Sequence, residues 1–91
     1  MDGSELDEER EVAWLAMPEK APVIGESGEE IGRMEELLGD KKGDIFHGII
    51  LKLARGGQKV EVRADRIAKI TTRRIYTDLA ADELEHLPPL K

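Results

Sequence analysis

The chain has 91 residues, no cysteine and a formal net charge of -6. A chain of this length forms one small domain, and the lack of cysteine excludes disulfides, thiolate nucleophiles and cysteine-ligated zinc. No apolar stretch approaches the roughly 20 residues needed to cross a bilayer, and the first residues are acidic where a secretory signal would be basic. We therefore expect a single cytoplasmic domain without membrane insertion.

Charge is divided unevenly along the chain. Residues 1–40 carry thirteen acidic side chains against three basic ones, whereas residues 41–77 carry three against ten. A basic segment beside an acidic one can meet an anionic partner or neutralise its own leader. Strands whose solvent-facing side chains happen to be basic explain the same pattern.

The first eleven residues are mostly acidic. They hold six acidic side chains, one basic side chain and few apolar ones. Such a segment cannot offset the entropy lost on ordering, so we expect a mobile leader over residues 1–11 and one domain over residues 12–87. The apolar run at residues 12–17 ends at Pro18 and predicts a short strand or a docking segment. Within it, Trp14 is expected to cap the protein's own core, with an anchor for a partner as the alternative.

Three glycines interrupt the next apolar stretch. Their spacing suits a strand at residues 23–24 followed by a reversal, with structural turn positions at Gly25, Gly28 and Gly32. Residues 31–38 are ambiguous, because Met34 and Leu37 have helical spacing while the glycines on either side leave little room for a helix. A strand is favoured.

A hairpin is predicted in the middle of the chain. Residues 45–54 form the longest apolar run, a strand with one face made of Ile49, Leu51 and Leu53. A two-residue reversal at Gly56 and Gly57 follows. Val60 and Val62 then alternate with charged residues, which predicts a second strand with both valines facing inward.

The remaining elements are short. Residues 64–66 predict a tight turn between strands, and two more strands are expected at 67–70 and 74–77. Asp78 is expected to cap a short helix at about 79–86, which Pro88 and Pro89 terminate, and residues 88–91 are expected to form a tail. About six strands in so small a chain would leave edges exposed in a flat sheet. We therefore expect a mainly β fold, a small closed or partly open β-barrel with a short C-terminal helix.

The order of these signals resembles the PRC-barrel family, which includes the cytoplasmic barrel of the photosynthetic reaction-centre H subunit and the C-terminal barrel of a ribosome maturation factor. The resemblance covers residues 22–77 and involves Val23, Gly28, Gly48 and Ile75 together with their apolar neighbours. These glycine and apolar positions specify a barrel rather than its use. The resemblance implies an adaptor or oligomerising module without an assigned reaction.

Candidate chemistry is sparse. The adjacent pairs Glu29-Glu30 and Glu35-Glu36 would point to opposite faces of a strand, so neither pair converges on a substrate. His47 is expected to be a partly buried ring, and no cysteine or spaced carboxylate set joins it as in a metal site. The glycines match no phosphate-binding loop. We expect no enzymatic activity, no cofactor and no metal.

Basic side chains on the expected strands offer the best candidate surface. Arg66 shares the same segment, and the possible interaction surface comprises Trp14, Lys52, Arg55, Lys59, Arg63, Lys69, Arg73 and Arg74. We expect a non-catalytic protein-interaction or self-association module, most simply a homodimer. The alternative is an accessory factor in ribosome or RNA metabolism that binds RNA or a ribosomal protein. Tyr76 is the only aromatic residue near the basic set, which disfavours base stacking.

Overall fold

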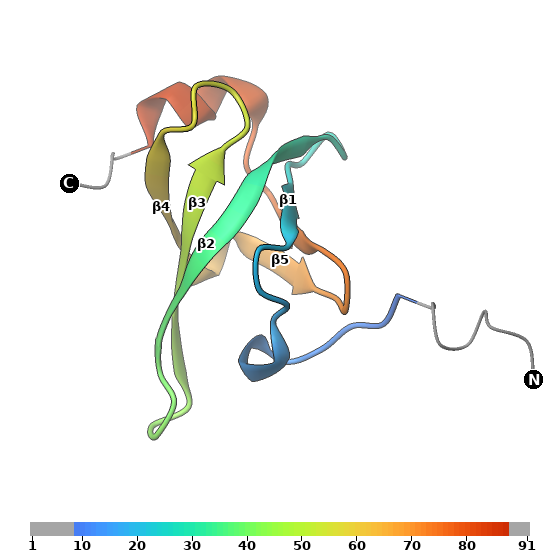
Figure 1. The fold of residues 1–91 in the computed structure, drawn as a ribbon, viewed down its shortest axis with the longest axis vertical. Coiled ribbons are helices and arrows are strands. Elements are labelled where there is room, and N and C mark those ends of the chain that lie inside the picture. Colours follow the sequence, from blue (N-terminus) through green and yellow to red (C-terminus); the bar gives the residue numbers. More distant parts are fainter. Residues whose placement is uncertain (1–8, 88–91) are drawn as a thin grey trace, which may run out of the picture.

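The computed structural model describes residues 9–87, which form one six-stranded sheet and three short 3₁₀ helices (Figure 1). The strands are β1 (Pro22–Ile24), β2 (Glu30–Asp40), β3 (Ile45–Leu53), β4 (Lys59–Arg63), β5 (Ile67–Ile70) and β6 (Ile75–Thr77). The helices are η1 (Trp14–Ala16), η2 (Ala64–Arg66) and η3 (Ala81–His86).

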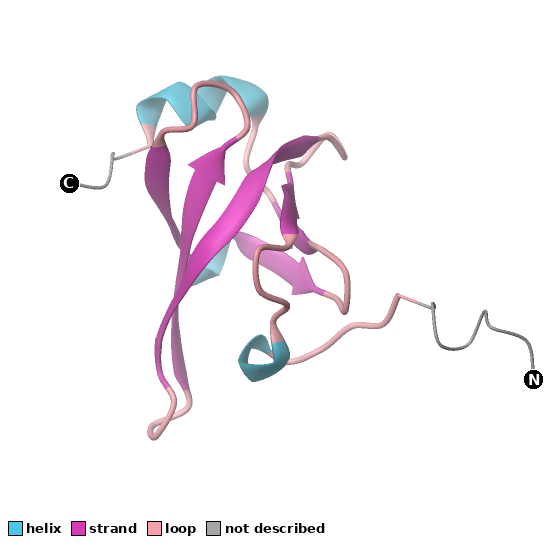
Figure 2. Ribbon diagram, viewed as in Figure 1, coloured by secondary structure: helices cyan, strands magenta, loops and turns pink. Residues whose placement is uncertain are grey.

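The sheet is curved and partly open. Its strand order is β4-β3-β2-β1-β6-β5, and all neighbours are antiparallel except β1 and β6. Strands β4 and β5 are the two edges, yet they follow one another in the chain, so η2 crosses the gap between them (Figure 2). The expected mainly β, partly open barrel is confirmed, while the closed form is not adopted by the described residues.

A bulge in strand β2 explains why its apolar residues have helical spacing. A bulge between Met34 and Glu36 places Met34 opposite Leu51 and Leu37 opposite Ile49. The extra residue at the bulge lets two side chains three positions apart face the same side of the sheet. The favoured strand is therefore confirmed, because pairing with both β1 and β3 overrides the helical preference of the segment.

The predicted hairpin of β3 and β4 is confirmed, with a longer turn than expected. The Leu53 N–H donates to the Gln58 carbonyl at 2.8 Å, so the reversal spans residues 54–57 rather than two glycines. Gly56 and Gly57 both have positive φ. The inward faces supply the largest fully buried side chains of this hairpin, which are Ile49, Leu51, Val60 and Val62.

Of the first three predicted turn glycines, Gly25 and Gly28 form a turn, whereas Gly32 is not a turn position. Gly28 closes a turn by donating its N–H to the Gly25 carbonyl at 3.0 Å. Gly32 instead lies inside β2, where an added Cβ would stand 2.2 Å from the Lys52 carbonyl oxygen. Gly32 therefore permits close contact between strands rather than a change of direction.

The segment before β1 docks on the barrel. Val12 donates its N–H to the Ile70 carbonyl at 2.8 Å, and η1 follows directly. The leader that we expected to be mobile differs in its last residues, because the Glu9 carboxylate accepts hydrogen bonds from Thr71 at 2.6 Å and from Tyr76 at 2.9 Å. It also pairs with Arg74. Residues 1–8 of that leader lie outside the described residues.

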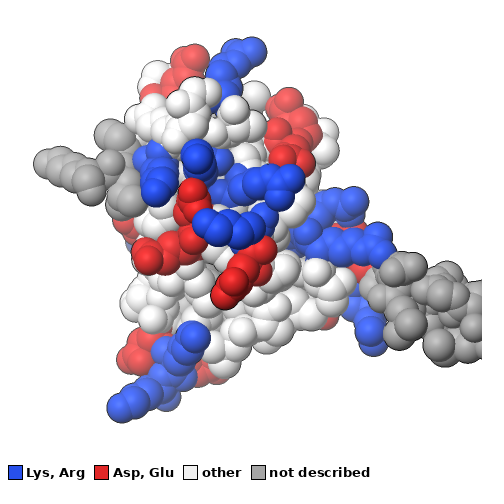
Figure 3. Space-filling model, in the orientation of Figure 1, with Lys and Arg blue, Asp and Glu red and all other residues white. Residues whose placement is uncertain are grey.

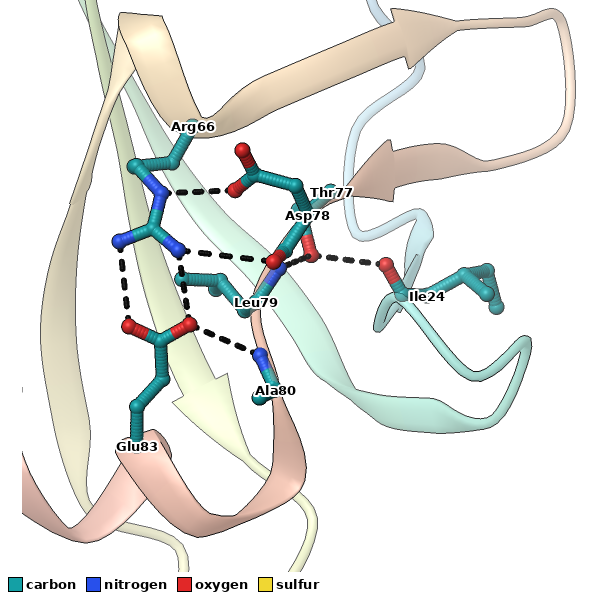
Figure 4. Close-up of polar contacts among 7 residues, drawn as sticks. All are labelled: Ile24, Arg66, Thr77, Asp78, Leu79, Ala80 and Glu83. Carbon is teal, nitrogen blue, oxygen red and sulfur yellow. Dashed lines mark hydrogen bonds and ion pairs between the residues drawn. The ribbon is translucent and has the colours of Figure 1, made fainter.

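The C-terminal helix begins later than predicted and is capped differently. Helix η3 starts at Ala81, and Glu83 accepts the Ala80 N–H at 2.8 Å. Asp78 is not its cap, because its carboxylate accepts the Arg66 Nε–H at 2.7 Å (Figure 4). Arg66 also donates to Glu83, so one guanidinium ties the β4–β5 turn to η3. The predicted tail at 88–91 lies outside the described residues.

At Gly48 the backbones of β3 and β4 lie too close together for a side chain. Its φ is 145°, and an added Cβ would lie 2.1 Å from the Val62 carbonyl oxygen. Gly48→Ala should lower the free energy of unfolding in urea by about 3 kcal/mol, from strain and strand displacement together. Gly28→Ala is the control, since φ is 87° there but no atom lies within 4 Å of the added carbon. Its loss should be about 1 kcal/mol. Equal losses would contradict a steric role for Gly48.

We call the contacts of Arg66 with Asp78 and Glu83 the Arg66 latch. The latch predicts that the fold is less stable in acid. Hydrogen bonds from Arg66 lower the pKa of Glu83 from its usual 4.5. A depressed carboxyl pKa contributes stability that is present above the unfolded value and is lost as the pH falls through the folded value. The free energy of unfolding should therefore decrease as the pH is lowered below about 4.5. Urea titrations at several pH values should show a weaker dependence of the unfolding free energy on pH for Glu83→Gln. The dependence should be unchanged for Glu85→Gln, because Glu85 is exposed. Identical slopes in both variants would exclude the latch.

Candidate interaction face of the sheet

The basic residues predicted to form one interaction surface occupy separate places. Lys52 and Lys59 lie on β3 and β4, Arg55 lies in their connecting turn, and Arg63 ends β4. Lys69 lies on β5, while Arg73 and Arg74 precede β6. Some of these cations are engaged within the protein, and the set does not converge on one surface.

Trp14 is used within the protein. Its ring stacks on Phe46 with centroids 5.4 Å apart, and its Nε1–H donates to Asp44 at 3.0 Å. These contacts fasten η1 to the start of β3. They agree with the interpretation that Trp14 covers its own core rather than anchoring a partner.

Two of the basic side chains around β6, Lys69 and Arg74, are also engaged within the protein. Lys69 lies 4.8 Å from the centre of the Tyr76 ring, in position for a cation–π contact. Arg74 pairs with Glu9, and its pKa is raised by the Tyr76 hydroxyl and the Glu9 charge. This part of the predicted surface holds the N-terminal segment in place.

The outward-facing side chains of β2, β3 and β4 include three neighbouring cations. Because side chains alternate along a strand, the residues paired with Lys52 share its face. Arg33 is opposite Lys52 on one side, and Lys59 is opposite Lys52 on the other. We call Arg33, Lys52 and Lys59 the cation row. Figure 3 shows Lys and Arg side chains gathered over these strands with carboxylates beside them.

The neighbouring positions on this face alternate in charge. Glu36 and Glu61 lie opposite Ile50 on its two sides. Ile50 is only 4% exposed although it lies outside the main core cluster. The outer face is therefore organised as a row of three cations followed by two carboxylates flanking a covered apolar side chain.

Like charges in the cation row lie close together. The Leu53–Gln58 hydrogen bond makes Lys52 and Lys59 a non-hydrogen-bonded pair, the kind in which Cα atoms are about 4.5 Å apart and side chains are closest. Arg33 has an ion pair with Glu30 at 4.0 Å, but both side chains are exposed to solvent, so the pair contributes little to stability. Directly opposed like charges destabilise a sheet.

One carboxylate responds to these cations. A hydrogen bond from Lys20 lowers the pKa of Glu35, and the charges of Lys59 and Lys52 lower it further against the effect of partial burial. The Lys20 Nζ and Glu35 Oε2 atoms are 2.5 Å apart. Lys20 and Arg33 were missed from the sequence because they lie in the acidic half of the chain. Only the β2–β3 register brings Arg33 to Lys52.

The outer edge of β4 is the second candidate feature. In an antiparallel pair, backbone groups point alternately toward and away from the neighbouring strand. Because the Gln58 carbonyl accepts the Leu53 N–H, the backbone groups of Val60 and Val62 point toward β3, and the N–H and C=O groups of Lys59, Glu61 and Arg63 point outward. Among the described residues no further strand pairs with that edge. The side chains of these three residues are basic, acidic and basic in turn.

A shallow groove of about 530 Å³ lies between η3 and the turn ends of the β sheet. Ile31, Leu53 and Leu84 supply apolar contacts, and Arg55 and several glutamates lie at its margin. No group of three or more histidine, cysteine, aspartate or glutamate side chains within residues 9–87 is placed to hold a metal ion. His47 is exposed rather than partly buried as expected.

No family model matches this chain, and no curated protein matches it either. The resemblance to PRC-barrel proteins therefore stays a prediction. In the part of the chain that the structure describes, no helix is long and apolar enough to cross a membrane.

The cation row predicts that one substitution stabilises the fold. Lys52→Glu places a carboxylate between Arg33 and Lys59 and converts two repulsive pairs into attractive ones. The free energy of unfolding in urea should rise by about 0.5 kcal/mol. Lys52→Gln, which removes the repulsion without adding attraction, should give a smaller gain. Destabilisation by both variants would show that the Lys52 charge supports the fold.

Proposed function

We propose that this protein is a non-catalytic interaction module of the PRC-barrel type that associates with a second copy of itself through the outer edge of β4. The observation that carries this is the combination of an edge strand that pairs with no further strand within residues 9–87 and a charge sequence on β4 that is self-complementary in shifted registers. The cysteine-free chain suits a reducing compartment, so we place the module in the cytoplasm.

Backbone geometry supports edge-to-edge association. The outward N–H and C=O groups of Lys59 and Glu61 are the hydrogen-bonding template that a sheet edge offers to another strand. Adding an antiparallel strand would join two six-stranded sheets and satisfy these groups in both copies. Closed two-fold symmetry is the commonest form of such assembly.

The charges on β4 select among possible registers. If two β4 strands paired with Glu61 opposite the partner's Glu61, like charges would meet at the centre and at both flanks. A shift of two residues either way keeps the same side-chain faces and places Glu61 opposite the partner's Lys59 or the partner's Arg63. Both shifted registers are complementary, so the edge favours a second copy in a defined alignment.

Charge exchange along β4 tests this dimer. Glu61→Lys makes the strand uniformly basic, and the double variant Lys59→Glu, Arg63→Glu makes it uniformly acidic. Each variant alone should remain monomeric in sedimentation equilibrium at concentrations where the original chain associates, because like charges then meet in every register. A mixture of the two should form a heterodimer.

The matched control is Glu36→Lys, which makes the same charge change on the same face but away from the β4 edge. It should leave self-association unchanged. Glu61→Pro removes one outward N–H while a folded edge strand tolerates proline there, so it should also abolish the dimer. An original chain that stays monomeric at high concentration, or a mixture that fails to associate, would refute the β4 contact.

A further inference from the structure

We propose that the cation row binds the carboxylates of an acidic protein segment. Arg33, Lys52 and Lys59 lie on three neighbouring strands and span about 10 Å, which is two strand spacings. This surface shares Lys59 with the β4 edge proposed for self-association, whereas Arg33 and Lys52 lie on the two neighbouring strands. It faces away from the core rather than along the plane of the sheet.

The folded protein leaves this row poorly neutralised. Glu35 offsets part of the charge of Lys52 and Lys59, but its carboxylate oxygen Oε2 is hydrogen-bonded to the Lys20 ammonium at 2.5 Å. Glu30 reaches Arg33 only at 4.0 Å, in an exposed pair that water and salt screen. Arg33 is also oriented, because its Nη1 donates to the Lys20 carbonyl at 3.2 Å. A bound anion would relieve repulsion that the folded chain bears on its own.

The surroundings of the row favour carboxylates over a phosphate backbone. Ile50 lies two residues before Lys52 on the same face of β3. Both residues paired with it are acidic, Glu36 on β2 and Glu61 on β4. A nucleic-acid strand that ran past the row would meet these charges, whereas a short acidic segment needs only the row itself. Alternate side chains of an extended segment are about 6.6 Å apart, so two of them fit within its length.

Aromatic placement points the same way. Single-stranded nucleic acids use aromatic side chains as stacking surfaces. Trp14 and Phe46 stack on each other, and the Tyr76 ring lies beneath Lys69. These are the three aromatic residues of the chain, and none is on the outer face of β2 to β4 beside the row.

Strand addition and ligand binding are compatible. A second copy joined at the β4 edge would extend the sheet sideways and leave its outer face open. Lys59 belongs to both surfaces, but the register that pairs Glu61 with the partner's Arg63 does not place the partner's Glu61 opposite it. Binding at the row requires no second copy, and Lys52→Gln changes the row without changing the β4 edge, so the two proposals fail separately.

The test compares two probes on the full chain. Fluorescence anisotropy at low ionic strength measures binding of a labelled eight-residue glutamate peptide and of a labelled eight-nucleotide oligouridine. The peptide should bind more tightly, and its affinity should fall steeply as salt is added. Lys52→Gln should weaken peptide binding about tenfold, as expected for the loss of about 1.4 kcal/mol.

Lys42→Gln is the matched control, because it removes the same charge from the exposed turn between β2 and β3. It should bind the peptide like the original chain. Lys52→Gln is expected to fold at least as stably, so its weakened binding would not reflect unfolding. Equal weakening by the two variants, no measurable peptide binding, or tighter binding of the oligouridine would each overturn the assignment.

Discussion

The pairing of β3 with β2 on one side and β4 on the other determines most of what this protein presents. It directs Ile49 and Leu51 inward, where both are fully buried. The same alternation directs Lys52 outward between Arg33 and Lys59. Core and charged face are therefore two sides of one register, and a one-residue slip would exchange them.

The sequence predicts the parts of the fold that depend on local pattern. The strict alternation around Val60 and Val62, together with Gly56 and Gly57, is sufficient for the hairpin. Strand β2 is harder because its bulge mixes two periodicities, and only its two neighbouring strands resolve the ambiguity. Asp78 satisfies the composition rule for a helix cap, yet the distant Arg66 competes for it. Long-range contacts of that kind leave no local signal.

The candidate surface was predictable in composition but not in arrangement. Basic side chains are concentrated in residues 41–77, but pairing divides them among the β2–β4 face, the Tyr76 region and the η3 latch. Arg33 joins Lys52 from nineteen positions earlier in the chain. Charge counts along a sequence cannot reveal such a neighbour, because strand register rather than proximity in the chain brings the two together.

The two exposed features of β4 differ in how freely they can change. Its outward backbone groups are inherent to an edge strand and can be blocked only by proline, distortion or a covering element. Its side-chain charges are not required by the core, since Val60 and Val62 occupy the inward positions. An edge with uniform charge would repel a second copy at no cost to packing. The basic, acidic, basic sequence instead leaves shifted registers in which opposite charges would face each other, as the proposed self-association requires.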